Sequence, residues 1–161
     1  MRNFILLFVA ALFVGCASPG VQVTTDDEKS QAIKAAYDGY LVNDFTASNE
    51  LYSEETAIYI NSVETISNEE NLAAFSSHHD FYIDISMSRT YIQTSAYDND
   101  LGTWTHAWFV WKGTGKASGN TFEVPCHVAY QWGDDGKIAQ TWFFSDQSNH
   151  LKELAAAGVE L

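Results

Sequence analysis

The sequence is short of basic residues, and this shortage excludes several kinds of partner. Its 161 residues include 8 Lys and Arg against 21 Asp and Glu, a formal net charge of −13 at pH 7. Such an acidic surface repels nucleic acid and anionic lipid headgroups, so we exclude nucleic acid as a partner. Arg2 and Arg89 are the only arginines, which argues against an arginine clamp for phosphates or dicarboxylates. Any small ligand is therefore predicted to be apolar or aromatic and uncharged.

The sequence also lacks the usual cofactor and nucleophile motifs. It contains no Gly-rich phosphate loop, no Cys-x-x-Cys pair and no Gly-x-Ser-x-Gly elbow, and we predict no cofactor. His78-His79-Asp80 invites comparison with a metal site. However, adjacent histidines project in different directions, and no further His or Cys lies nearby at a ligand-like spacing. We therefore predict a solvated loop here and no metal.

The N-terminus is predicted to be a targeting segment rather than part of the fold. Arg2 precedes an apolar run at Phe4–Val14 that is too short to span a bilayer as a permanent helix. The run ends at Leu12-Phe13-Val14-Gly15-Cys16, which resembles the lipobox of bacterial lipoproteins. That resemblance implies a signal peptide over residues 1–15 and acylation of Cys16. An ordinary secretory signal cleaved nearby is the alternative, and either interpretation predicts export.

Cysteine is scarce as well, with only Cys16 and Cys126 in the chain. If Cys16 is lipidated, Cys126 has no intramolecular partner, so the core must stabilise the domain without a disulfide. Cys126 lies among apolar strand residues and is predicted to be a buried, inert thiol rather than a nucleophile.

The residue after Cys16 bears on which membrane holds the anchor. Ala17 replaces the Asp that favours inner-membrane retention in enterobacterial lipoproteins. The resemblance therefore implies an outer-membrane anchor that faces the periplasm.

The residues after Cys16 predict a short tether and one domain. Residues 16–25 are mostly small and polar and indicate a flexible tether. Residues 26–161 are enough for one domain with one core. Helices are predicted from Asp26-Asp27 to about Val42, over 45–52 and from a capping box at Ser67–Glu70. Strands are predicted at about 56–61, 81–97, 103–112, 121–132 and 137–145, before a last helix at 150–157. Early helices and a late antiparallel meander indicate an α+β domain.

Four segments of the last third carry a family resemblance: Phe122–Pro125, Tyr130–Ile138, Phe143–Gln147 and Leu151–Leu154. They resemble the SnoaL-like group of nuclear transport factor 2-like (NTF2-like) proteins. The resemblance covers the whole predicted domain and implies a cone-shaped fold, with a curved antiparallel sheet packed on N-terminal helices. It also implies a homodimer formed through the sheet. It specifies the chemistry poorly, because the family includes cyclases, isomerases, hydrolases, dehydratases and members without a reaction.

Strand alternation places one carboxylate among the predicted inner residues. In the strand at 121–132 the even positions are apolar, so Tyr130 is predicted to face inward and His127 outward. In the last strand Trp142, Phe144 and Asp146 share one phase with Ile138, which predicts a partly desolvated Asp146 with a raised pKa. The resemblance implies an acid/base role for Asp146. The structural alternative is an Asp that caps the following helix.

The strand at 104–112 is apolar on both faces, which suits a central strand between helices and a partner subunit. His106 shares its face with Trp108 and is interpreted either as a base beside Asp146 or as a satisfied core or interface residue. The residues predicted to line an apolar pocket are Tyr37, Trp108, Tyr130, Trp142 and Phe144.

Three functions fit this sequence, which does not decide whether the protein is an enzyme. The first, slightly favoured, is a cofactor-free acid/base enzyme of isomerase, cyclase or hydratase type on a small hydrophobic carbonyl compound. The second is a non-catalytic module of the cell envelope that binds a small molecule or a partner. The third is a dimeric envelope protein whose cone is filled by its own aromatic side chains.

Overall fold

The computed structural model describes residues 20–160; the predicted signal peptide and Cys16 lie outside the described residues. The helices are α1 (Glu28–Leu41), α2 (Thr46–Leu51), α3 (Asn68–Phe81) and α4 (Ser148–Ala156). The strands are β1 (Gln22–Thr24), β2 (Tyr52–Ile60), β3 (Thr65–Ile66), β4 (Tyr82–Ala96), β5 (Thr103–Gly115), β6 (Thr121–Trp132) and β7 (Ile138–Ser145).

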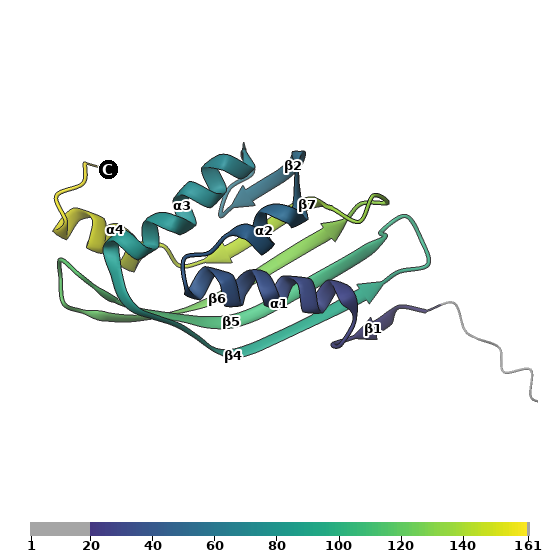
Figure 1. The fold of residues 1–161 in the computed structure, drawn as a ribbon, viewed down its shortest axis with the longest axis horizontal. Helices are drawn as coiled ribbons and strands as arrows, with labels where there is room; N and C mark the ends of the chain where they lie inside the picture. Colours follow the sequence, from purple (N-terminus) through teal and green to yellow (C-terminus); the bar gives the residue numbers. More distant parts are fainter. Residues whose placement is uncertain (1–19, 161) are drawn as a thin grey trace, which may run out of the picture.

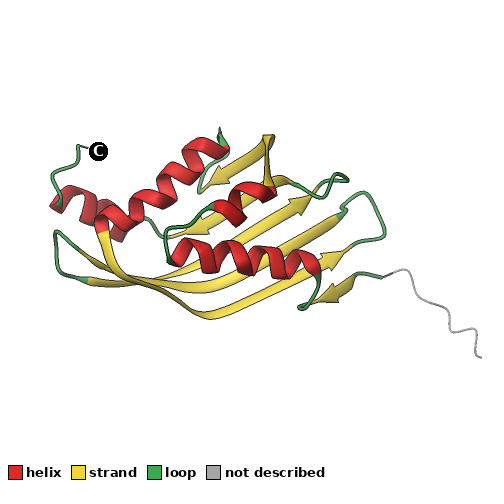
Figure 2. Cartoon of the chain, in the orientation of Figure 1, coloured by secondary structure: helices red, strands yellow, loops and turns green. Residues whose placement is uncertain are grey.

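The strands form one curved sheet in the order β1-β4-β5-β6-β7-β2-β3. Neighbouring strands are antiparallel except β2 and β7, which are parallel. The helices gather over one side of the sheet, as Figures 1 and 2 show. This is the predicted α+β architecture, in which the late meander β4–β7 forms one layer and the helices form a second layer packed on it.

Irregularities in β4 give the sheet much of its curvature. Its pairing with β5 shifts register between Ile83 and Ser86 and again between Ser88 and Tyr91. Asp84 and Arg89, one within each shift, have positive φ angles of 54° and 52°. Bulges of this kind bend a strand and increase its twist. The curved sheet wraps around the helices and leaves room between them.

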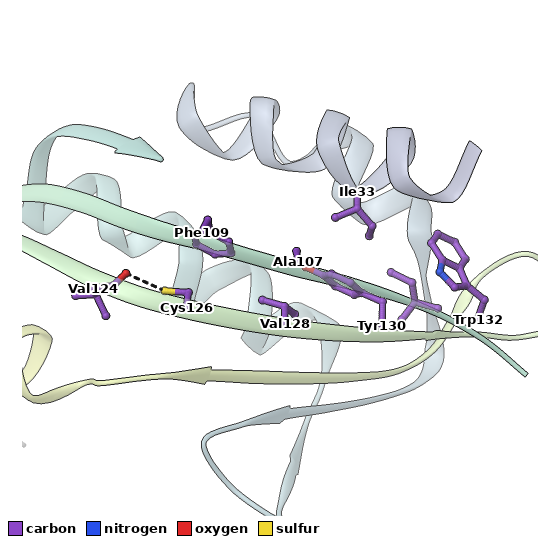
Figure 3. Packing of buried hydrophobic residues seen from close by; sticks show 9 residues of the cluster. Ile33, Ala107, Phe109, Val124, Cys126, Val128, Tyr130 and Trp132 are labelled. Carbon is purple, nitrogen blue, oxygen red and sulfur yellow. Dashed lines mark hydrogen bonds between the residues drawn. The ribbon is translucent and has the colours of Figure 1, made fainter. Parts of the chain in front are cut away.

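The core lies between α1 and the concave face of the sheet. Ile33 of α1 packs over a row from β5 and β6 that includes Phe109, Val128 and Tyr130, as Figure 3 shows. Cys126 belongs to this row and is 8 % exposed. Burial raises the pKa of the Cys126 thiol to about 11. The thiol is therefore protonated at neutral pH, which confirms the prediction of a buried, inert cysteine.

Two predicted helix starts are confirmed by their capping contacts. Asp27 is the N-cap of α1, where its carboxylate accepts hydrogen bonds from the backbone N–H groups of Lys29 and Ser30. Ser67 and Glu70 form a reciprocal capping box at the start of α3. Each contact satisfies backbone donors that the first turn of a helix leaves free.

Two segments differ in secondary structure from the sequence prediction in ways that matter for the site and the N-terminus. Gln22–Thr24, expected to belong to a flexible tether, pairs as β1 with Thr94–Ala96 at the edge of β4. Helix α3 continues to Phe81, so His78-His79-Asp80 lies in its last turns and not in a solvated loop. Helical phase therefore carries His78 to the inner face of α3, with consequences for the site described below.

A buried carboxylate fastens α4 to the hairpin between β5 and β6. Glu153 is 0 % exposed. One of its oxygens accepts a 2.7 Å hydrogen bond from the backbone N–H of Ala117, and the other accepts one of 3.3 Å from Ser118. Burial acts to raise the pKa of Glu153, but these hydrogen bonds and His150 outweigh it and lower the pKa. Glu153 thus acts as an ionised clamp one turn after His150.

No helix among residues 20–160 is both long enough and apolar enough to cross a membrane.

Candidate active-site cavity

A cavity of about 230 Å³ lies between the concave face of the sheet and the helices. Its lining is mostly apolar and aromatic, with Ile33, Phe75, Phe109 and Phe143 among the residues that form it. All the helices and strands β2 and β4–β7 contribute to the walls. A concave, largely apolar space with a few polar groups is the usual form of a small-molecule site.

The first polar group is a relay that holds His78. Trp111 Nε1 donates a 2.7 Å hydrogen bond to the Tyr40 hydroxyl, which lies 2.8 Å from Nδ1 of His78. Within the described residues, His78 Nδ1 is the only acceptor for the Tyr40 hydroxyl proton, since Trp111 can only donate. Tyr40 therefore donates to His78, and the neutral imidazole carries its proton on Nε2. That N–H has no hydrogen-bond partner among residues 20–160, and His78 lines the cavity.

The second polar group is His150, in the first turns of α4. Its Nδ1 lies 3.0 Å from the Tyr82 hydroxyl, and its ring centre is 5.2 Å from that of His78. Burial lowers the pKa of His150, although Glu153 opposes the shift. Burial also lowers the pKa of His78 to about 4, with smaller contributions from His150 and His79. The cavity thus contains two imidazoles that are neutral at pH 7.

A third polar group lies where α3 crosses the cavity. Asn71 is 5 % exposed and lines the cavity. Its side-chain amide makes no hydrogen bond to any residue that the structure describes. Buried amides are normally satisfied by protein or water, so Asn71 offers hydrogen bonds that a bound molecule can use.

Tyrosine hydroxyls supply the remaining polarity. The hydroxyls of Tyr37 and Tyr130, both predicted pocket residues, lie 2.9 Å apart. The Thr141 hydroxyl donates a 3.5 Å hydrogen bond to the Tyr52 hydroxyl. All four residues line the cavity.

Asp146 lies at the rim of this cavity, but its environment differs from the one predicted. The residue is exposed, and Oδ1 accepts a 2.9 Å hydrogen bond from the backbone N–H of Ser148. Hydrogen bonds from Ser148 lower the pKa of Asp146, so the predicted raised pKa is wrong. The physical reason is solvation, because the last strand has ended and the carboxylate lies in a turn before α4. Asp146 is therefore ionised at neutral pH.

The predicted inward direction of Trp142 and Phe144 is also wrong. Gln131 pairs with Gln140 while Trp132 pairs with Ile138, so β7 has one additional residue and its phase reverses after Ile138. Thr141, Phe143 and Ser145 face the cavity instead. Trp142 and Phe144 lie on the convex face, where Trp142 stacks on Tyr59 at 3.9 Å.

His106 and Trp108 lie on the same convex face, away from Asp146. His106 Nδ1 is 3.2 Å from His127 Nε2, and the two rings are stacked. Trp108 stacks on His127 at 4.9 Å and is 38 % exposed. The proposed pairing of His106 with Asp146 in one pocket is therefore contradicted by the structure, whereas the predicted outward direction of His127 is confirmed.

The sequence analysis missed His78, His150 and Asn71. Asn71, Phe75, His78 and Tyr82 recur at helical spacing and line one wall of the cavity. The sequence would have shown this pattern if the helix that begins at Ser67 had been predicted to continue past Phe75. Among residues 20–160 no group of three or more His, Cys, Asp or Glu side chains is placed to hold a metal ion.

Known structures share this fold. A candidate polyketide cyclase from Xanthomonas campestris pv. campestris is 16 % identical, with a TM-score of 0.60 over 78 % of this chain and 95 % of that one. A candidate polyketide cyclase from Pseudomonas putida is 17 % identical, with a TM-score of 0.59 over 76 % and 94 %. A candidate hydroxylase from Streptomyces galilaeus is 12 % identical, with a TM-score of 0.63 over 80 % and 85 %.

This likeness, together with the curved sheet and its helices, confirms the predicted cone-shaped NTF2-like fold. At these identities it shows the fold alone. No protein-family model and no curated protein matches the chain.

Burial of His78 predicts a stability that depends on pH. The pKa of His78 is about 4 in the folded state and about 6.5 in an unfolded chain, so below pH 6.5 the unfolded state binds more protons. The contribution of His78 to the free energy of unfolding should therefore fall by about 2 kcal/mol between pH 7 and pH 5. Urea denaturation at several pH values measures the total slope, to which His150, His106 and His127 also contribute because burial lowers their pKa values. His78→Gln should reduce the fall by about 2 kcal/mol, and an unchanged slope in that variant would contradict the assignment.

Proposed function

We propose that the chain is a cofactor-free acid/base enzyme that acts on a small, hydrophobic carbonyl compound bound in the cavity. The observation that carries this proposal is the Trp111–Tyr40–His78 relay. It fixes the imidazole tautomer so that Nε2–H is free to donate to a ligand in an otherwise apolar space. A neutral imidazole that donates to a carbonyl oxygen stabilises negative charge as it develops there.

The proton acceptor in this proposal is Asp146. Its carboxylate is ionised and lies on the rim of the same cavity. Asp146 takes the proton from the carbon next to the carbonyl, and the electron pair of that C–H bond forms a carbon–carbon double bond. The carbonyl oxygen becomes an enolate oxygen that accepts a hydrogen bond from Nε2–H of His78. Where the enolate is conjugated with a further carbon–carbon double bond, return of the proton to the far end of that system gives an isomer, and attack of an enolate on a second carbonyl closes a ring.

Exchange of α-protons tests this function without knowledge of the natural substrate. The purified protein is incubated in D2O with 1,4-diacetylbenzene, and loss of the methyl proton signal is followed by NMR. The proposal expects binding and an exchange rate well above that of buffer alone. Binding without acceleration would replace the enzyme by the binding module, and no binding would contradict both.

A non-catalytic binding module is the second candidate, and one observation favours it. Asp146 is exposed and has a lowered pKa, which makes it a weaker base than the sequence predicted. A binding module needs the cavity and its hydrogen-bond donors but no proton acceptor. It would hold the ketone equally well after Asp146→Asn.

We also propose that the protein is exported and lipid-anchored through Cys16, in the outer membrane facing the periplasm. The apolar run at Phe4–Val14 and the lipobox-like sequence before Cys16 support this address. Mass spectrometry of the mature N-terminus tests it, because an acylated Cys16 should be the first residue. A mature chain that begins elsewhere would favour the ordinary secretory signal.

A homodimer through the convex face of the sheet is a further proposal. Tyr91, Trp108 and Phe144 are 51 %, 38 % and 47 % exposed on this face. Ring contacts join Tyr91 to Trp108 in a tilted arrangement, and stacked rings connect Trp108 and Phe144 to His127 and Trp142. Exposed apolar patches often mark interfaces. Trp108→Arg is expected to give a monomer by light scattering at concentrations where the native chain is dimeric. Val63→Arg, which changes an exposed side chain in the turn between β2 and β3, is the control.

A further inference from the structure

Three tyrosines, Tyr37, Tyr52 and Tyr130, line one wall of the cavity. Tyr130 pairs with Thr105 of β5, six residues along that strand from Trp111, whose ring contacts His78. The tyrosine wall and the histidine pair therefore lie at different ends of the cavity. Tyr130 of β6 is 6 % exposed, and its hydroxyl contacts that of Tyr37 on α1. Tyr52 begins β2, and its hydroxyl has the Thr141 hydroxyl as its one described partner. Tyr37 and Tyr40 lie three residues apart on α1, but Tyr37 reaches toward β6 whereas Tyr40 reaches toward His78.

These hydroxyl groups carry more protons than the described residues around them have atoms to accept. The contact between Tyr37 and Tyr130 uses one of their two protons, whichever residue donates. The contact between Thr141 and Tyr52 uses the threonine proton, which leaves the Tyr52 proton free. Two phenolic O–H groups that border the cavity are therefore without an acceptor among residues 20–160. Buried polar hydrogens normally donate a hydrogen bond to some acceptor. These two O–H groups are therefore available to donate to an acceptor atom of a bound ligand.

The tyrosine wall is uncharged, which limits the charge that the acceptor of the ligand can carry. Burial raises the pKa of Tyr52 to about 12 and holds those of Tyr37 and Tyr130 well above the usual value, so all three hydroxyls stay protonated. Among the described residues that line the cavity there is no Lys or Arg. A buried anion would be left without a countercharge, which is costly. The wall therefore suits a neutral oxygen.

We propose that Tyr37, Tyr52 and Tyr130 form a second subsite of the cavity, which binds a carbonyl oxygen on the end of the ligand remote from His78. This inference deepens the proposed function and rests on it. It defines the ligand class as an uncharged, apolar-bodied compound with two carbonyl groups at opposite ends. The carbonyl at His78 is the one activated, and the carbonyl at the tyrosine subsite orients the molecule.

Three single-ring compounds of nearly the same shape test this subsite. They are 1,4-diethylbenzene with no acceptor, 4-ethylacetophenone with one carbonyl, and 1,4-diacetylbenzene with two at opposite ends. Dissociation constants are measured by NMR titration of the purified protein. The two-carbonyl compound should bind about fivefold more tightly than the one-carbonyl compound, as expected for one added neutral hydrogen bond.

Variants then assign that preference to the tyrosines. Tyr37→Phe with Tyr130→Phe keeps both rings and removes one of the two free O–H groups, so it should reduce the preference for the two-carbonyl compound while leaving 1,4-diethylbenzene unchanged. Tyr52→Phe removes a hydroxyl with only a 3.5 Å contact and supplies the same test if the double variant does not fold. Tyr91→Phe is the matched control, because its hydroxyl bonds to Gln93 on the sheet surface.

The outcomes separate the subsite from the function on which it rests. Equal affinity of the two ketones for the native protein would overturn the subsite and leave the proposed function standing. A preference that survives all the tyrosine variants would overturn the subsite as well. Failure of all three compounds to bind would overturn both proposals.

Discussion

Asp146→Asn is expected to slow the exchange of α-protons of bound 1,4-diacetylbenzene by about a hundredfold, the usual contribution of a general base. Asparagine keeps the oxygen that accepts the Ser148 N–H, so the turn before α4 and the affinity for the ketone should be preserved. The loss is therefore one of proton transfer and not of structure or binding. Exchange rates and the dissociation constant, measured on the same samples, separate these effects.

Asp135→Asn is the matched control for this substitution. Asp135 accepts a 2.9 Å hydrogen bond from the backbone N–H of Lys137, so it makes the same kind of turn outside the cavity. Its variant should exchange protons at the native rate. If Asp146→Asn exchanged α-protons at the native rate, Asp146 would not be the general base. His78→Phe should also reduce exchange by about a hundredfold, because it removes the donor to the enolate oxygen.

Gly115→Ala is expected to destabilise the protein by about 3 kcal/mol, which combines overpacking with weakened hydrogen bonds of Glu153. A Cβ at position 115 would lie 2.0 Å from Oε2 and 2.3 Å from the carboxyl carbon of Glu153. Glu153 is fully buried and cannot move without losing its contacts to Ala117 and Ser118. Thermal denaturation should show a melting temperature lower by about 10 °C.

A double-mutant cycle checks this cause. Glu153→Ala alone should also destabilise, because two backbone N–H groups lose their acceptor. Addition of Gly115→Ala to that variant should cost little more, because the clashing atoms are gone. Gly133→Ala is the control, since the nearest atom to its Cβ belongs to the exposed side chain of Asp135 at 2.9 Å. Additive losses in the cycle would show that the two residues do not clash.

The parts of the fold that local patterns determine were predictable. Asp27 and Ser67 cap their helices as their residue types favour, and alternation in β6 assigned its faces correctly because that strand has a regular register with β5. The order of helices α1–α4 and of strands β2 and β4–β7 followed from the same patterns, whereas the short strands β1 and β3 were not predicted. These features depend on residues close together in the sequence.

The site was less predictable because it depends on irregular backbone. One additional residue early in β7 reversed the faces of Trp142 and Phe144, and nothing in the local sequence marks that bulge. The positive φ of Arg89 in β4 is equally unmarked, because arginine has no preference for that region. His78 was misplaced because its helix was ended too early. A histidine that is predicted to lie in a loop has no helical or strand phase, so its side chain could not be predicted to line the cavity.

Strand β1 limits how the domain can be oriented at a membrane. Gln22 pairs with Ala96 at the edge of β4. If Cys16 carries the proposed lipid, only the five residues 17–21 separate it from the sheet, a reach of at most about 20 Å. Anchored in this way, the protein would hold the β1 end near the bilayer, while α4, the helix that contains His150, lies at the opposite end of the molecule (Figure 1). The histidine end of the cavity then faces the aqueous compartment. A ligand would arrive there by diffusion through water and not by lateral movement out of the lipid.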